Sequence, residues 1–111
     1  MNELTAVEVL SALSQETRLS IVRFLISRGE QGAAAGEVAA EVGAQGSRAS
    51  FHLSYLEKAG VVSSERVSRK IIYRANLEKI GGTISFLLND CCGCHPQIMA
   101  CCVGGEHSCC D

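Results

Sequence analysis

Long apolar runs are missing from this sequence of 111 residues, and so is an export signal. No stretch approaches the roughly twenty apolar residues that a membrane-spanning helix requires. The first residues, MNELTAVEVL, carry neither the basic flank nor the cleavage site of a signal peptide. We therefore expect a cytoplasmic protein without membrane contact, and the length predicts one compact core.

Cysteine is missing from residues 1–90, whereas seven cysteines follow in residues 91–110. No disulfide can therefore cross-link the core. Cytoplasmic thiols are kept reduced, which leaves them free for metal, metalloid or redox chemistry. We expect a domain at residues 1–89 that is stable without cross-links, followed by a cysteine-rich segment and tail at residues 90–111.

The sequence also lacks the alternating strands and helices of an α/β core. A Cys-x-x-Cys reductase would need such a core, with its motif at a strand-to-helix turn. Here the motif Cys91-Cys92-Gly93-Cys94 follows a predicted helix instead. We therefore do not expect an enzyme.

Apolar periodicity predicts helices over most of the domain. One stripe from Leu4 to Leu13 describes a first helix, and Ser14 would break it and N-cap a second. Short helices are predicted at residues 33–43 and 46–60, ended by Gly43 and Gly60. The predicted buried face of the second helix consists of Leu19, Val22, Leu25 and Ile26, and that of the last helix of Leu77, Ile80, Ile84, Leu87 and Leu88.

Two short helices joined by a tight turn predict a helix-turn-helix at residues 33–60. The β-branched segments VVSSERV and KIIYRAN predict a hairpin around Ser68 and Arg69, although its turn lacks glycine. The expected fold is mainly α with a small β-hairpin wing, a winged helix-turn-helix. The first and last helices have no evident partner in so small a domain, so we expect a homodimer through them.

Charge is unevenly spread, although the formal net charge is only -2. Residues 1–44 carry three Arg against six Glu, whereas residues 45–79 carry seven Lys and Arg against three Glu. This basic excess falls on the second helix of the helix-turn-helix and on the hairpin. It favours a DNA-binding surface, in which the helix enters the major groove and the hairpin lies along phosphates; a merely solvated surface is the alternative.

Three segments carry a further signal: LSQETRLSIVRFLI, GEVAAEVGAQGSRASFHLSYLEKAGVV and RVSRKIIYR. Together they resemble the ArsR family of winged helix-turn-helix repressors. The resemblance extends to about Asn89 and is carried by Ser14, Thr17, Arg18, Leu19, Ser50, Phe51, His52, Leu53 and Tyr73. It implies a homodimer that binds double-stranded operator DNA without a cofactor and releases it when a metal or metalloid binds.

By position, the resemblance implies a set of DNA-contacting residues on the second helix of the helix-turn-helix, predicted at residues 46–60, and on the wing. Arg48 is the best candidate for a guanine edge because its planar fork can bond two acceptors. For His52, a packed or phosphate-contacting role is favoured over a metal role, and Tyr55 and Tyr73 are expected to pack. The set is Gln45, Ser47, Arg48, Ser50, His52, Arg66, Arg69 and Lys70.

One departure concerns the sensing site. The best-known arsenic repressors of the family carry Cys-x-Val-Cys in the helix before the recognition helix, where this sequence has GEVAAEV. Other members end their last helix with a Cys-Cys pair followed by a further cysteine. Cys91 and Cys92 match that pair, so the resemblance implies a C-terminal site for trivalent arsenic or antimony.

The cysteine chemistry allows several ligand sets. Adjacent Cys91 and Cys92 are poor disulfide partners but good chelators, and soft thiolates select soft acceptors. Cys94, Cys101 and Cys102 compete for the third position, and the expected metal set is Cys91, Cys92, Cys101 and Cys102. Cys109 and Cys110 are assigned to the tail, as His95 and His107 are.

Three alternatives stay open. Zinc, cadmium or lead would also accept these thiolates, with His95 or His107 as spare zinc ligands. A redox regulator would use Cys91 or Cys94 as the attacking thiol and a later cysteine to resolve it. A constitutive DNA-binding protein would make no use of the tail.

Overall fold

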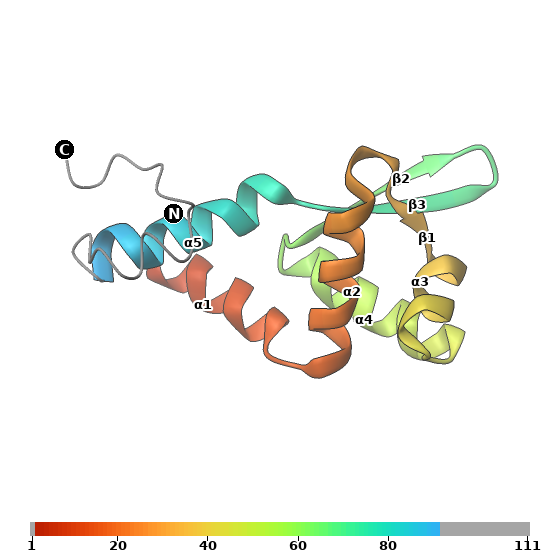
Figure 1. Cartoon of the computed structure of the whole chain (residues 1–111), viewed down its shortest axis with the longest axis horizontal. Helices are drawn as coiled ribbons and strands as arrows, with labels where there is room; N and C mark the ends of the chain where they lie inside the picture. Colours follow the sequence, from red (N-terminus) through yellow and green to blue (C-terminus); the bar gives the residue numbers. More distant parts are fainter. Residues whose placement is uncertain (1, 92–111) are drawn as a thin grey trace.

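The computed structural model describes residues 2–91, and the side chains of that part as far as residue 88. Within it the chain forms five α-helices, a 3-10 turn and a three-stranded sheet (Figure 1). This confirms the predicted winged helix-turn-helix. In chain order the elements are α1 (Glu3–Leu13), α2 (Glu16–Arg28), η1 (Gly29–Gln31), β1 (Ala33–Ala34), α3 (Ala35–Val42), α4 (Gly46–Lys58), β2 (Val62–Val67), β3 (Lys70–Ala75) and α5 (Leu77–Cys91).

The sheet has the order β1-β3-β2, and both pairs are antiparallel. Strands β2 and β3 form the predicted hairpin, in register from Val62 opposite Ala75 to Val67 opposite Lys70. Its turn succeeds without glycine because Ser68 adopts the left-handed conformation, with φ 60°. Strand β1 is a correction, because Ala33–Ala34 pairs with β3 instead of starting the helix.

Two details of α2 also differ from expectation. Gln15, not Ser14, is its N-cap, and the Gln15 side chain accepts a hydrogen bond from the Arg18 amide at 2.9 Å. Ser14 instead ends α1. The helix is rotated relative to the predicted stripe, so Ile21 is buried while Leu19 and Ile26 are exposed. Apolar residues on two sides of a helix leave its rotation undetermined by periodicity alone.

The core lies where α1, α2, α3 and α4 meet the base of the hairpin. Its main side chains are Val9, Ile21, Val22, Leu25, Val38, Leu53, Leu56, Val61 and Val62. Helix α1 reaches this core through Val9 and Ala12 and also contacts α5. The expectation that α1 and α5 lack partners within the domain is therefore wrong for their inner faces. Their outer faces stay exposed at Leu4, Val7, Leu10, Leu77, Ile84 and Leu87.

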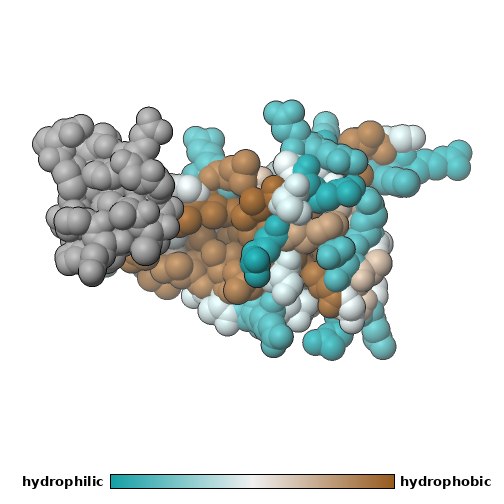
Figure 2. Space-filling model, in the orientation of Figure 1, coloured by the Kyte–Doolittle hydropathy of each residue, from teal (hydrophilic) through white to brown (hydrophobic). Residues whose placement is uncertain are grey.

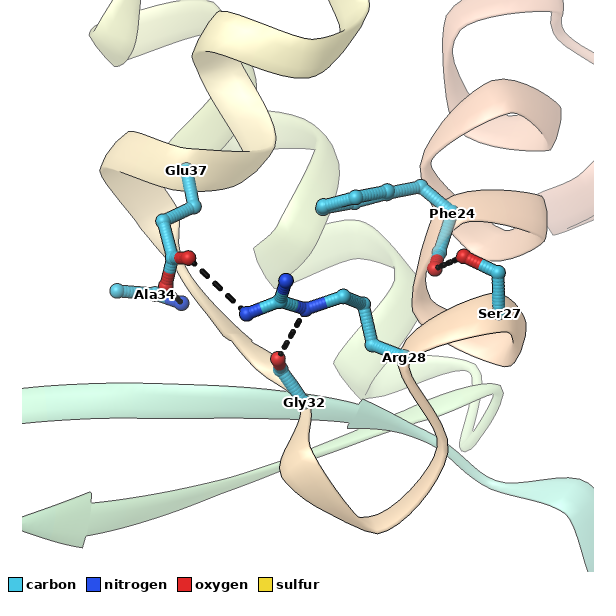
Figure 3. A network of polar contacts seen from close by, with 6 residues as sticks. All are labelled: Phe24, Ser27, Arg28, Gly32, Ala34 and Glu37. Atoms are coloured by element: carbon cyan, nitrogen blue, oxygen red, sulfur yellow. Dashed lines mark hydrogen bonds and ion pairs between the residues drawn. The ribbon is translucent and has the colours of Figure 1, made fainter.

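A polar network fixes the junction between α2 and α3 (Figure 3). Arg28 at the end of α2 donates from Nε to the Gly32 carbonyl at 2.9 Å and forms an ion pair with Glu37 at 3.1 Å. Glu37 in turn accepts a hydrogen bond from the Ala34 amide at 3.0 Å, so it caps the first turn of α3. This network holds the start of the helix-turn-helix against the preceding helix and strand.

Gly32 is required at this junction. Its φ is +64°, and an added Cβ would lie 2.5 Å from the Tyr73 carbonyl oxygen. We predict that Gly32→Ala lowers the free energy of unfolding by at least about 2 kcal/mol, because the left-handed conformation and the backbone clash add. Urea denaturation measures this change.

Gly36→Ala is the matched control, because a Cβ there meets nothing within 4 Å. Its stability should be unchanged or higher by up to about 1 kcal/mol, since alanine favours a helix over glycine. Equal stabilities of the two variants would contradict the assigned role of Gly32.

Candidate nucleic-acid interface

Helices α3 and α4 form the helix-turn-helix around a short turn. Gly43 ends α3 in the left-handed conformation, and the Ala44 amide donates to the Ala39 carbonyl at 3.1 Å. Gln45 then enters α4 with extended backbone and forms no side-chain cap hydrogen bond. Its amide group is therefore not used in capping the helix and projects from the turn, where it is exposed.

Helix α4 has one buried face and one exposed face. The buried face, Ala49, His52, Leu53 and Leu56, packs against the core. Burial of these residues turns the other side of the helix outward. The predicted contact residues Ser47, Arg48 and Ser50 all lie in the first half of this exposed side.

Phe51 is a residue that the predicted contact set omits. It lies on the exposed face of α4 and keeps 66% of its surface accessible. Phe51 does not fit the spacing of the buried residues Ala49, Leu53 and Leu56. That spacing would have indicated from the sequence that Phe51 is exposed, provided that the rotation of α4 was known. An exposed aromatic ring on such a helix can contact the methyl group of thymine in the major groove.

His52 differs from the rest of the predicted set because it is buried, with 7% of its surface exposed. Its ring lies edge-on to Phe51, and its Nδ1 has no hydrogen-bond partner among the described residues. Burial, and then the charges of Arg18 and Arg48, lower the pKa of His52, so the ring is neutral near pH 7. These features favour the packed alternative over a direct DNA contact.

The wing carries three cations that stay available. Arg66, Arg69 and Lys70 are exposed, and within residues 2–91 none of them forms an ion pair. Arg74 behaves differently, because it pairs with Glu65 at 2.8 Å and donates to the Glu30 carbonyl at 2.6 Å. The free wing cations can therefore neutralise phosphates, while Arg74 stabilises the base of the hairpin.

The predicted contact residues thus fall into two groups, one on the first half of α4 and one at the end of the hairpin. Hydrophilic side chains gather around the hairpin end of the molecule, whereas hydrophobic ones cover much of the α1 and α5 end (Figure 2). A helix with exposed polar residues beside a basic hairpin suits the major groove and the adjacent backbone of DNA.

Known proteins share this arrangement. A helix-turn-helix domain family matches residues 13–65. The HTH-type transcriptional regulator YgaV of Escherichia coli strain K12 is 32% identical over 87 residues, which span 78% of this chain and 86% of that protein. The structure of an ArsR-like transcriptional regulator from Rhodococcus sp. RHA1 superposes with a TM-score of 0.72 at 27% identity, covering 95% of this chain and 96% of that one.

The chain belongs to the ArsR family of helix-turn-helix transcriptional regulators. The same fold occurs in the homodimeric winged helix-turn-helix domain of Mb0332 from Mycobacterium bovis, with a TM-score of 0.60 at 23% identity, covering 83% of this chain and 85% of that one. The family confirms a DNA-binding regulator.

The predicted metal site lies largely outside the described residues. Cys91 is the last residue of α5, and Cys92, Cys101 and Cys102 are not described. Among residues 2–91 no group of three His, Cys, Asp or Glu side chains could hold a metal ion, and no helix of this part could span a membrane. The metal ligand set therefore stays a prediction.

Arg48 provides a direct test of the DNA surface in this ArsR-family protein. We predict that Arg48→Ala weakens binding to a duplex selected from random DNA by about 1–3 kcal/mol, because a two-point contact to a base edge is lost. Fluorescence anisotropy measures the affinity. Arg48→Lys keeps the charge without the planar fork, so it should retain binding to random DNA while losing preference for the selected duplex. Unchanged affinity of Arg48→Ala would place the interface elsewhere.

Proposed function

We propose that this ArsR-family regulator represses transcription as a homodimer and releases its operator when C-terminal thiolates bind trivalent arsenic or antimony. One observation supports the proposal above all. Helix α5 packs against α1 and ends at Cys91, the first residue of the Cys-Cys pair. A ligand held by this pair would therefore act at the end of a helix that belongs to the folded domain.

The thiol chemistry favours a metalloid. Trivalent arsenic takes three sulfurs in a pyramid, and a methylated arsenic takes two. Cys91 and Cys92 supply two adjacent thiolates, and Cys94, Cys101 or Cys102 would supply the next. Soft thiolates bind such acceptors in preference to hard cations. Because residues 1–90 contain no cysteine, every thiol of this chain lies at or after the last residue of α5 in the sequence.

The proposed dimer uses the outer faces of α1 and α5. A mainly apolar groove runs between these helices, lined by Glu3, Ala6, Val7, Leu10, Thr83, Phe86 and Leu87. Exposed apolar residues continue along both helices, at Leu4, Val7, Leu10, Ile84 and Leu87. A continuous apolar surface of this kind is typical of a protein interface. The winged helix-turn-helix domain of Mb0332, which has the same fold, is homodimeric.

We predict that Leu87→Asp converts a wild-type dimer into a folded monomer, because a charge would be buried at the interface without a partner. Sedimentation equilibrium measures the mass, and circular dichroism checks the helices. Leu19→Asp is the matched control: Leu19 is 45% exposed and Leu87 47%, but Leu19 lies on α2. The control should stay dimeric. A monomeric wild-type protein would contradict the proposed interface.

Operator release tests the proposed inducer. We predict that arsenite weakens binding of the wild type to its selected duplex by about 5- to 150-fold, the usual range of coupling between two ligands. Cys91→Ser with Cys92→Ser should abolish this effect, because the chelating pair is lost. Fluorescence anisotropy with increasing arsenite, antimonite or methylarsenite measures it.

Cys109→Ser with Cys110→Ser is the control, because it removes another adjacent pair that the proposal does not use. This variant should respond as the wild type does. Release by zinc or cadmium but not by arsenite would indicate a divalent-metal sensor. Release by peroxide alone would indicate a redox sensor, and no release by any of these would indicate constitutive binding.

A further inference from the structure

Arg18 joins two helices that a groove separates. The groove is lined by Val7, Glu8 and Ser11 from α1, by Tyr55 and Lys58 from α4, and by Ala59, the C-cap of α4. The two helices are therefore not closely packed along this stretch. Arg18 belongs to neither helix, because it lies in the first turn of α2.

The guanidinium group of Arg18 contacts both sides of this junction. Its Nε donates to the Ala12 carbonyl at 2.7 Å and its Nη2 to the Ser11 carbonyl at 3.4 Å, both in the last turn of α1. Its central carbon lies 4.2 Å from the centroid of the Tyr55 ring on α4. The carbonyl contacts fix the plane of the guanidinium, and the Tyr55 ring packs against that plane as a cation-π partner.

Tyr55 lies on the same face of α4 as Arg48 and Phe51 of the candidate DNA surface. Arg48, Phe51 and Tyr55 are spaced by three and four residues, so they lie along one stripe of the helix. Tyr55 is 41% exposed, so core packing holds its ring only in part. A contact that holds Tyr55 therefore adds to the core packing that sets the rotation of α4 and so the direction of Arg48.

We infer that Arg18 is a positioning residue for DNA recognition: by holding Tyr55 against the end of α1, it sets the orientation of the recognition helix relative to α1. This role concerns the choice of DNA sequence and not the inducer. It predicts that loss of the contact lowers the affinity for the correct sequence. The affinity for random DNA, which depends mainly on phosphate contacts, should change little.

The test compares Tyr55→Leu with Tyr55→Phe in the full chain. The affinities for the duplex selected with wild-type protein and for random DNA are measured by fluorescence anisotropy. Tyr55→Leu should lower the ratio of the two affinities about three- to tenfold, as expected for the loss of a cation-π contact. Tyr55→Phe keeps the ring and should stay within about twofold of the wild type.

Arg18→Gln should lower the ratio similarly, and the variant Arg18→Gln with Tyr55→Leu should lose no more than the larger single loss, because the two residues act as one unit. The slope of log affinity against log salt should stay unchanged in all these variants. A decrease of about one in the slope for Arg18→Gln would mean a direct phosphate contact and overturn the inference.

Two further outcomes would also overturn it. If Tyr55→Phe loses as much as Tyr55→Leu, the hydroxyl group and not the ring carries the effect. If the affinities for selected and random DNA fall by the same factor, Arg18 and Tyr55 only stabilise the fold. Thermal melting of each variant confirms that the measurements are made on folded protein.

Discussion

Burial of one face of α4 is the constraint on which the DNA-binding surface depends. Leu53 and Leu56 are fully buried in the core together with Ile21 and Leu25 of α2. A helix that buries a stripe of this kind cannot rotate without exposing apolar area, at a cost of about 25 cal/mol for each Å². The exposed stripe that includes Arg48 is therefore set by the apolar residues behind it. The same packing buries His52. This residue of the recognition helix therefore packs in the interior, and its exposed neighbours on α4 are the ones available to contact DNA.

The polar contacts are arranged so that some cations hold the fold and others stay available. Arg28 and Arg74 are tied to carboxylates and carbonyls near the sheet, and Arg18 is tied to the end of α1. Arg48 has no ion pair among the described residues, and neither have the three wing cations. A paired cation has already exchanged its water for protein groups, whereas an unpaired one can still release counterions from a phosphate. Only part of the basic excess of residues 45–79 is therefore available to bind phosphates, because Arg74 is already paired with Glu65 and the Glu30 carbonyl.

Much of the fold was predictable from the sequence, because the helices and the hairpin bury regular apolar patterns between clear stop signals. Gly43 ends α3 as expected, and the hairpin spans the predicted segments. The wrong predictions concern segments whose local sequence is compatible with two different structures. Ala33 and Ala34 favour a helix by propensity, but pairing with β3 overrides it. Leu19 and Ile26 could have faced the core, but the packing of α2 selects Ile21 instead. For the candidate site, the resemblance was enough to place four exposed residues on the surface of the helix-turn-helix: Gln45, Ser47, Arg48 and Ser50. The exposure of Phe51 and the contact between Arg18 and Tyr55 were not predictable in this way. Both depend on how the helices pack together, which the local sequence does not determine.

The position of the thiols limits how an inducer can reach DNA in the proposed mechanism. The cysteine-free helix α3 packs directly on α4, so a site there would act on the recognition helix at short range. Thiols that begin at the end of α5 have no such access. Their effect begins at the α1 and α5 faces, because α5 contacts α1 and α1 contacts α2 within residues 2–91. The start of α5 is also joined to the end of α4 through Asn76, whose side chain donates to the Gly60 carbonyl at 3.0 Å and accepts from the Lys79 amide at 3.1 Å. An inducer that shifts the α1 and α5 faces of a two-fold dimer would therefore change the spacing of the recognition helices, which is the quantity that a symmetric operator measures.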